Sequence, residues 1–360
     1  MSDGVRVIGG WIRRFAGVAV LAVWMGPWLG CAAVVLPLDE IDPAPIALLY
    51  WDDETSRRRK ELLEQAQLPP GARAGSGVAT PESLGQFFGV KREGALQLLA
   101  RLAQFPGRLS LLDPRTGRLE RVQAAWPDSK PLAWSADHKE LLFTSDHKTG
   151  KYQLYVYDVE SRNVRRLTRS TESHLAGDVS DDGRYVFTGV RARGKELSAH
   201  LYLTGPHGVD PEVVFDGAFG EVCFVPGGDD VLLVRADVRS GRRNAPPLLV
   251  VRSLDDREAP ERVVARGRHP AVSANGEWVV YSGALSGGGW RLVRIRPDGA
   301  GRAPVGKGAR DETMPAVSPD GRHVAYVTEE GEFDRLFVRR IDGSGDRVLL
   351  DDGSVAWPVW

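Results

Sequence analysis

Short apolar runs, separated by polar turn residues, recur along the chain in nearly the same pattern. In the clearest copy, residues 316–326, an apolar run ends at Ser318-Pro319-Asp320-Gly321 and a second apolar run follows. Asp bonds nearby backbone in tight turns and Gly accepts a positive φ, so the pattern predicts two antiparallel strands joined by a turn. Four further copies occur, at residues 133–143, 178–187, 223–233 and 271–281.

The copies are evenly spaced, and each is followed by two more predicted strands. The aligned positions Ser135, Ser180, Val225, Ser273 and Ser318 recur roughly every 45 residues, a period typical of β-propeller blades. Residues 155–158 and 164–168 illustrate the third and fourth strands of one unit. The sequence therefore predicts an all-β fold, a β-propeller of four-stranded antiparallel blades.

The two ends of the chain supply strands for one more blade. Residues 358–360 match 315–317, the end of an innermost strand. Residues 46–52 resemble a second strand, 108–117 a third strand with its turn, and 119–122 a fourth strand. We expect residues 355–360 to pair with 46–51 and to close a six-bladed ring. Pairing the two terminal segments removes exposed strand edges, which favour aggregation.

One long segment, residues 53–107, interrupts this composite blade. Charged residues spaced four apart, as in Lys60 and Glu64, and an apolar stripe around Leu96 and Leu99 predict helices on either side of a Gly- and Pro-rich loop. Two interpretations stay open. The insertion packs against the side of the ring, or it contacts a partner.

The first 38 residues have the pattern of an export signal or membrane anchor, which leaves residues 39–360 for the propeller. Arg13 and Arg14 precede an uncharged stretch, residues 15–38. Within it, Gly30-Cys31 fits the lipid-attachment motif of bacterial lipoproteins, although Trp28 and Leu29 fit it less well. We predict lipidation at Cys31, a periplasm-facing propeller and a membrane-anchored chain. An uncleaved anchor and simple signal cleavage are the alternatives.

Composition restricts the possible partners. The formal net charge is −1, which gives no general footprint for nucleic acid. The chain has two cysteines, and a lipid on Cys31 would leave none to pair with Cys223, which we interpret as a buried apolar residue.

We find no established catalytic or cofactor motif in the sequence. It lacks a Gly-x-Ser-x-Gly elbow, a His-Glu-x-x-His pair, a Cys-x-x-Cys pair and a phosphate-binding loop. Four polar residues precede predicted innermost strands and are candidates for binding in the central funnel: Glu172, His174, His269 and Glu312. They could hold a metal or an acidic sugar if they came together, but we predict no metal and no cofactor.

The repeat resembles that of the TolB family. The resemblance rests on Ser318-Pro319-Asp320-Gly321 before an apolar strand and on Arg165-Arg166-Leu167-Thr168 at a blade end. The non-catalytic propellers of prolyl-oligopeptidase-like peptidases have a similar repeat. The resemblance implies a six-bladed ring and, as often in this family, a role in the bacterial cell envelope with a protein partner there. TolB itself is periplasmic and binds a peptidoglycan-associated lipoprotein.

Two functional hypotheses follow from these observations. The first is a non-enzymatic cell-envelope scaffold that binds a protein partner. The alternative is a metal-assisted polysaccharide lyase or hydrolase that uses the funnel. Clustering of at least three of the four funnel candidates within metal-ligand distance would favour the second hypothesis.

Overall fold

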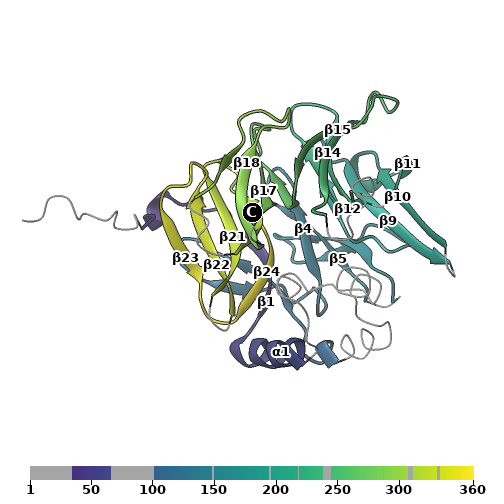
Figure 1. The fold of residues 1–360 in the computed structure, drawn as a ribbon. Helices are drawn as coiled ribbons and strands as arrows, with labels where there is room; N and C mark the ends of the chain where they lie inside the picture. Colours follow the sequence, from purple (N-terminus) through teal and green to yellow (C-terminus); the bar gives the residue numbers. More distant parts are fainter. Residues whose placement is uncertain are drawn as a thin grey trace, which may run out of the picture. The chain divides into compact units, whose positions relative to one another are not determined.

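Six four-stranded antiparallel sheets, each forming one blade, lie within residues Val35–Trp360 (Figure 1). The computed structural model describes residues 35–65, 101–147, 150–193, 196–217, 219–237, 245–286, 288–306, 311–330 and 333–360. Each innermost strand contacts the innermost strand of the next blade, and the last contacts the first, so the ring is closed. The predicted six-bladed propeller is confirmed.

The four strands of each blade follow one another outward from the ring axis. The innermost strands are β4 (Lys130–Trp134), β8 (Gly177–Val179), β12 (Phe219–Val225), β16 (Arg268–Val272), β20 (Glu312–Val317) and β24 (Ser354–Val359). The second strands are β1 (Ile46–Trp51), β5 (Glu140–Ser145), β9 (Tyr185–Arg193), β13 (Asp230–Arg235), β17 (Val279–Ala284) and β21 (His323–Glu330).

The outer half of each blade consists of its third and outermost strands. The third strands are β2 (Arg108–Leu112), β6 (Gln153–Asp158), β10 (Glu196–Leu203), β14 (Leu248–Ser253), β18 (Trp290–Ile295) and β22 (Phe333–Arg340). The outermost are β3 (Leu119–Arg121), β7 (Val164–Arg166), β11 (Glu212–Asp216), β15 (Arg262–Arg266), β19 (Ala303–Pro304) and β23 (Asp346–Leu350). Within the described ranges, two short 3-10 turns lie outside the sheets, η1 (Leu38–Glu40) and η3 (Pro206–Gly208).

The repeated Ser-Pro-Asp-Gly phrase forms a hydrogen-bonded turn between the first two strands of a blade. Ser318 Oγ donates to Asp320 Oδ1 at 2.5 Å and accepts from the backbone N–H of His323 at 2.9 Å. Gly321 has a φ of +69°, which a side chain would disfavour. The turn residues thus satisfy their own polar groups and fix the register of β20 and β21.

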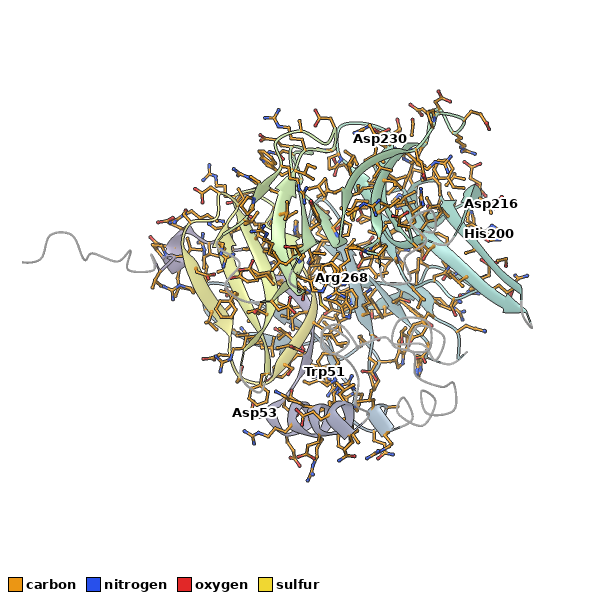
Figure 2. All side chains as sticks on the ribbon, viewed as in Figure 1. Trp51, Asp53, His200, Asp216, Asp230 and Arg268 are labelled. Carbon is orange, nitrogen blue, oxygen red and sulfur yellow. The ribbon has the colours of Figure 1, made fainter. Side chains whose placement is uncertain are left out.

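Helix α1 (Asp53–Gln65) follows β1 directly and begins the insertion. Figure 2 shows Trp51 and Asp53 where the strand passes into the helix. The Arg59 guanidinium lies 4.7 Å from the centre of the Trp51 ring and donates to the carbonyls of Leu102 and Phe105 at 3.2 and 2.9 Å. The two ends of the insertion are therefore joined to each other, and the predicted stripe around Leu96 lies outside the described residues.

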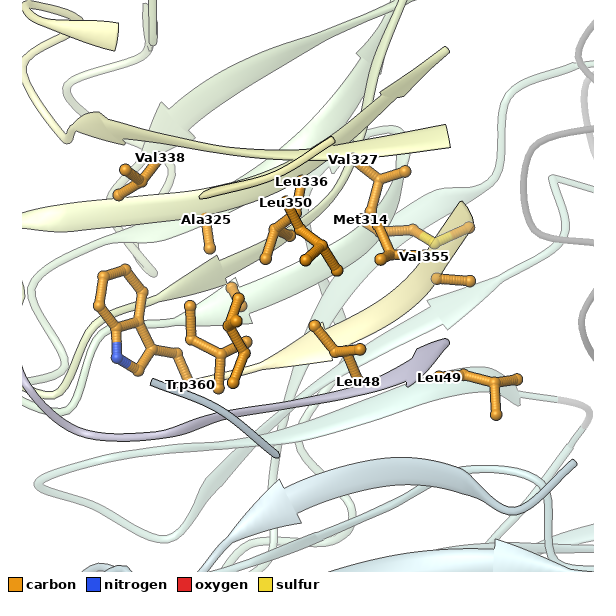
Figure 3. Packing of buried hydrophobic residues seen from close by; sticks show 14 of the residues in the cluster. Leu48, Leu49, Met314, Ala325, Val327, Leu336, Val338, Leu350, Val355 and Trp360 are labelled. Atoms are coloured by element: carbon orange, nitrogen blue, oxygen red, sulfur yellow. The ribbon is translucent and has the colours of Figure 1, made fainter. Parts of the chain in front are cut away.

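The composite blade forms as predicted. In the sheet β24-β1-β2-β3, Trp51 lies opposite Ser354 and Ala47 opposite Val359. Figure 3 shows Leu48 and Val355 from the two terminal segments in one cluster with Leu336 of the adjacent blade. Full burial of each such side chain stabilises the fold by about 1.5–3 kcal/mol, so closure is held by both pairing and packing.

The chain is already packed on the ring before β1. Leu36 and Ile41 are fully buried, and Arg347 Nε of β23 donates to the Leu36 carbonyl at 2.5 Å. Packing on the ring thus begins within residues 1–38, the segment that we assigned to the export signal or anchor. The earlier part of that segment, with Cys31, lies outside the described residues. From Val35 onward, no described helix has the length and apolar character needed to cross a membrane.

Candidate functional site

The innermost strands surround a cavity of about 560 Å³ along the ring axis, which we call the axial cavity. Every blade contributes to its wall. Its polar and large lining side chains include Lys130, Trp134, Asp178, Glu221, Cys223, Phe224, His269, Met314, Trp357 and Trp360. Volumes of this size accommodate small molecules or a short stretch of peptide.

Three lining residues have an unusual backbone conformation. His269, Met314 and Trp357 have φ angles of 52°, 50° and 55°, and each precedes a proline. Each lies at a register shift between the first two strands of its blade. Left-handed conformations of non-glycine residues cost energy, and bulges change the direction of side chains. The same bulge on three neighbouring blades places these side chains around the axial cavity.

Lys130, on β4, is a buried cation in this cavity. Its side chain is 9% exposed, and its Nζ lies 3.5 Å from the centre of the Trp357 ring. Burial lowers the pKa of Lys130 to about 8, although the charge of Glu221 opposes this shift. Among the residues that the structure describes, the ammonium has a cation–π contact but no hydrogen-bond acceptor.

The carboxylate of Glu221, on β12, is held by His269. One oxygen accepts from the His269 backbone N–H at 2.7 Å, and the other lies 3.7 Å from the His269 Nε2. Burial raises the pKa of Glu221, and the charge of Lys130 lowers it. Burial and the cations Arg268 and Lys130 lower the pKa of His269 well below its usual value, so its imidazole is neutral near pH 7. Figure 2 shows Arg268 towards the middle of the ring.

Asp178 and Cys223 also line the wall, and both have raised pKa values. Asp178 accepts from the backbone N–H groups of Phe224 and Val179 at 2.7 and 2.9 Å, and burial raises its pKa to about 6. The Cys223 thiol donates to the Pro270 carbonyl at 3.5 Å, and burial raises its pKa well above the usual value. Cys223 is half-buried and is held as a neutral thiol, not as a nucleophilic thiolate.

Of the four predicted funnel residues, His269 lines the axial cavity, whereas the other three are buried away from its lining. Glu172 accepts from the Tyr202 hydroxyl at 3.0 Å, and His174 Nδ1 bonds the Thr188 carbonyl at 2.9 Å. Burial lowers the pKa of His174. Within the described ranges, no three His, Cys, Asp or Glu side chains group as metal ligands.

Glu312 instead belongs to a buried set that we call the Arg339 network. Arg339 Nη1 donates to Glu312 Oε1 and to the Val305 carbonyl, both at 2.8 Å. Its Nη2 donates to the Tyr326 hydroxyl at 2.6 Å and to Asp346 at 3.0 Å. The network joins one blade to the outer strand region of the preceding blade, so its role is structural.

Sequence reasoning missed Lys130, Glu221, Met314 and Trp357 as lining residues. The sequence does contain a signal for three of them, a proline directly after the residue near the start of the repeated phrase. This proline follows Lys130, Met314 and Trp357, as it follows His269. Glu221 has no such signal. Its position follows from the three-dimensional register of β12.

Comparison with known proteins supports the fold. The Tol-Pal system protein TolB of Wolinella succinogenes is 25% identical over 243 residues, which cover 63% of this chain and 53% of that protein. The crystal structure of TolB from Acinetobacter baumannii has a TM-score of 0.60 at 16% identity and covers 88% of this chain and 66% of the other.

The chain has the β-propeller fold of TolB and resembles it in sequence. It spans about half the length of the curated TolB that it matches. A probable chloroplastic glutamyl endopeptidase of Oryza sativa subsp. japonica is 29% identical over 147 residues, which cover 38% of this chain and 15% of that protein. No protein-family model matches the sequence.

Proposed function

We propose that this TolB-like propeller is a non-enzymatic scaffold of the bacterial cell envelope that binds a protein partner at the axial cavity. The observation that carries the proposal is the wall of that cavity, which bulged Trp357, Met314 and His269 line together with a buried lysine. Rigid strands with strained, inward-turned side chains are typical of a recognition site. The similarity to a Tol-Pal system protein supports the envelope and a protein partner.

The proposal includes membrane attachment through a lipid on Cys31 and a second partner contact on the insertion, residues 53–107. The lipid is supported by the basic and apolar leader that ends in Gly30-Cys31. A Cys31→Ser variant should lose incorporation of labelled fatty acid. Mature protein that still carries residues 1–30, measured by mass spectrometry, would favour an uncleaved anchor.

The binding proposal is tested with the full chain in detergent, cross-linked in a bacterial envelope extract. Trp357→Ala removes a large lining side chain and should abolish capture of the partner. Val263→Ala, on outer strand β15 and 52% exposed, is the matched control and should retain capture. Circular dichroism checks that both variants are folded.

Two results would contradict this function. Capture that survives Trp357→Ala as well as it survives Val263→Ala would exclude the axial cavity as the binding site. Polysaccharide cleavage by the purified chain, lost on chelation of metal, would favour the lyase or hydrolase alternative.

A further inference from the structure

The state of Lys130 is unusual for a lysine that serves only the fold. A buried ammonium normally has acceptors for its three donors, because an unpaired buried charge is costly. Lys130 is more than nine-tenths buried, lines the axial cavity and has only the Trp357 ring and the charge of Glu221 to stabilise it in the described part of the chain. Its position leaves donors available to a molecule in the cavity.

We propose that the axial cavity binds the C-terminal end of a peptide chain, with the terminal carboxylate on the Lys130 ammonium. The proposal rests on the proposed function, because it names the chemical group of the partner that enters the ring. A carboxylate is the acceptor that forms the strongest hydrogen bonds with an ammonium, and a desolvated cavity strengthens them.

Glu221 selects a peptide end over a bare anion. A second negative charge near Glu221 is unfavourable by itself, but a C-terminal residue also carries a backbone N–H donor close to its carboxylate. Glu221 lines the same cavity as Lys130 and its charge acts on that ammonium, and its side chain is 21% exposed despite the bond from the His269 N–H. One cation and one carboxylate thus match the acceptor and the donor of a peptide end.

The apolar wall fits the remainder of such a ligand. Trp134, Trp357, Trp360, Phe224 and Met314 line the cavity with several proline rings. These rigid surfaces lose little conformational entropy when a ligand packs against them. The cavity volume of about 560 Å³ lies within the range of sites that enclose small ligands.

The experiment uses the full chain and three probes: N-acetyl-tetraalanine with a free carboxylate, the same peptide as its C-terminal amide, and acetate. Binding is measured by calorimetry at pH 7. Reductive methylation of lysines by formaldehyde is measured in parallel, with each site located by peptide mapping. We expect the peptide acid to bind at least about tenfold more tightly than its amide, since the amide loses one charged hydrogen bond. We expect the acid to bind more tightly than acetate by a similar factor, since acetate has no backbone N–H to donate to Glu221.

Methylation tests the proposal in the wild-type protein, without any substitution. The peptide acid should slow methylation of Lys130, whereas Lys139, whose side chain is 68% exposed, should react equally with and without the probe. Lys130→Met should then weaken binding of the acid to the level of the amide. Lys139→Met is the matched control and should leave binding unchanged.

Three results would overturn the proposal: equal binding of acid and amide, acetate binding as tightly as the peptide acid, or no protection of Lys130. Any of these could occur while Trp357→Ala still abolishes capture of the partner. Conversely, loss of the proposed function would appear as capture that is insensitive to Trp357→Ala. The two failures are therefore distinguishable.

Discussion

The Arg339 network and the Lys130–Glu221 pair are both buried charge clusters in the same ring, yet they differ in how completely they are hydrogen-bonded. Arg339 has four acceptors within 3.0 Å, supplied by Val305, Glu312, Tyr326 and Asp346. Lys130 has the Trp357 ring at 3.5 Å and no hydrogen-bond acceptor among the described residues, and the Glu221 carboxylate whose charge acts on it is bonded to the His269 N–H.

The difference indicates two roles for buried charge in one fold. A cluster whose four Nη donors are all hydrogen-bonded stabilises the contact between blades and leaves no Nη donor for a ligand. A cluster that retains donors beside a cavity costs stability, and binding of an acceptor would offset that cost. Stability measurements on each cluster should therefore respond in different ways.

The largest effect is expected at the Arg339 network. Arg339→Met should lower the free energy of unfolding by about 3–5 kcal/mol, because it leaves the buried Glu312 carboxylate without its partner. Denaturant titration measures this change. The double variant Arg339→Met with Glu312→Gln is the control and should recover part of the loss. An Arg339→Met protein as stable as wild type would show that the network is dispensable.

An intermediate effect is expected at Lys130, and it depends on pH. The pKa of Lys130 is about 8 in the fold and 10.5 in the unfolded chain, so the unfolded state binds more protons between these values. Unfolding free energy should therefore rise with pH in this window, by about 3 kcal/mol in total at 1.36 kcal/mol per pH unit.

The measurement is the difference between wild type and Lys130→Met, from denaturant titrations between pH 7 and pH 10.5. Subtraction removes the tyrosines, whose raised pKa values act in the opposite direction at higher pH. Lys139→Met should reproduce the wild-type slope. A wild-type slope that persists in Lys130→Met would assign the pH dependence to another group.

The fold was predictable from the sequence because its signals are local and repeated. Ser318, Asp320 and Gly321 satisfy their own turn, so each blade carries the information for its first two strands. The pairing of residues 46–51 with 355–360 was predictable as well, since each segment lacks partners among its sequence neighbours and pairs in the structure.

The site was harder to predict from the sequence, because bulges and contacts between blades determine which residues line the axial cavity. Glu312 and His269 both lie near the start of an innermost strand, yet Glu312 bonds Arg339 while the bulge at His269 turns this residue toward the axis. No local pattern separates these outcomes. What separates them is the position of an arginine on a third strand, 27 residues further along the chain from Glu312.

The smallest effect is expected at Asp178, and it tests whether the axial cavity as a whole disfavours charge. Burial raises the pKa of Asp178 to about 6, so the folded state binds more protons than the unfolded state between pH 4 and pH 6. Its contribution to stability therefore falls as the pH rises through this window. Asp178→Asn keeps one oxygen that can accept from the Phe224 N–H and loses the bond from the Val179 N–H. It should still increase stability at pH 7, by about 1 kcal/mol after allowance for partial exposure and for the lost bond. The gain should disappear at pH 4, where the wild-type carboxyl is protonated in the fold. Thermal unfolding of both proteins at the two pH values measures it, and a variant less stable than wild type at pH 7 would show that the charge of Asp178 is needed by the fold.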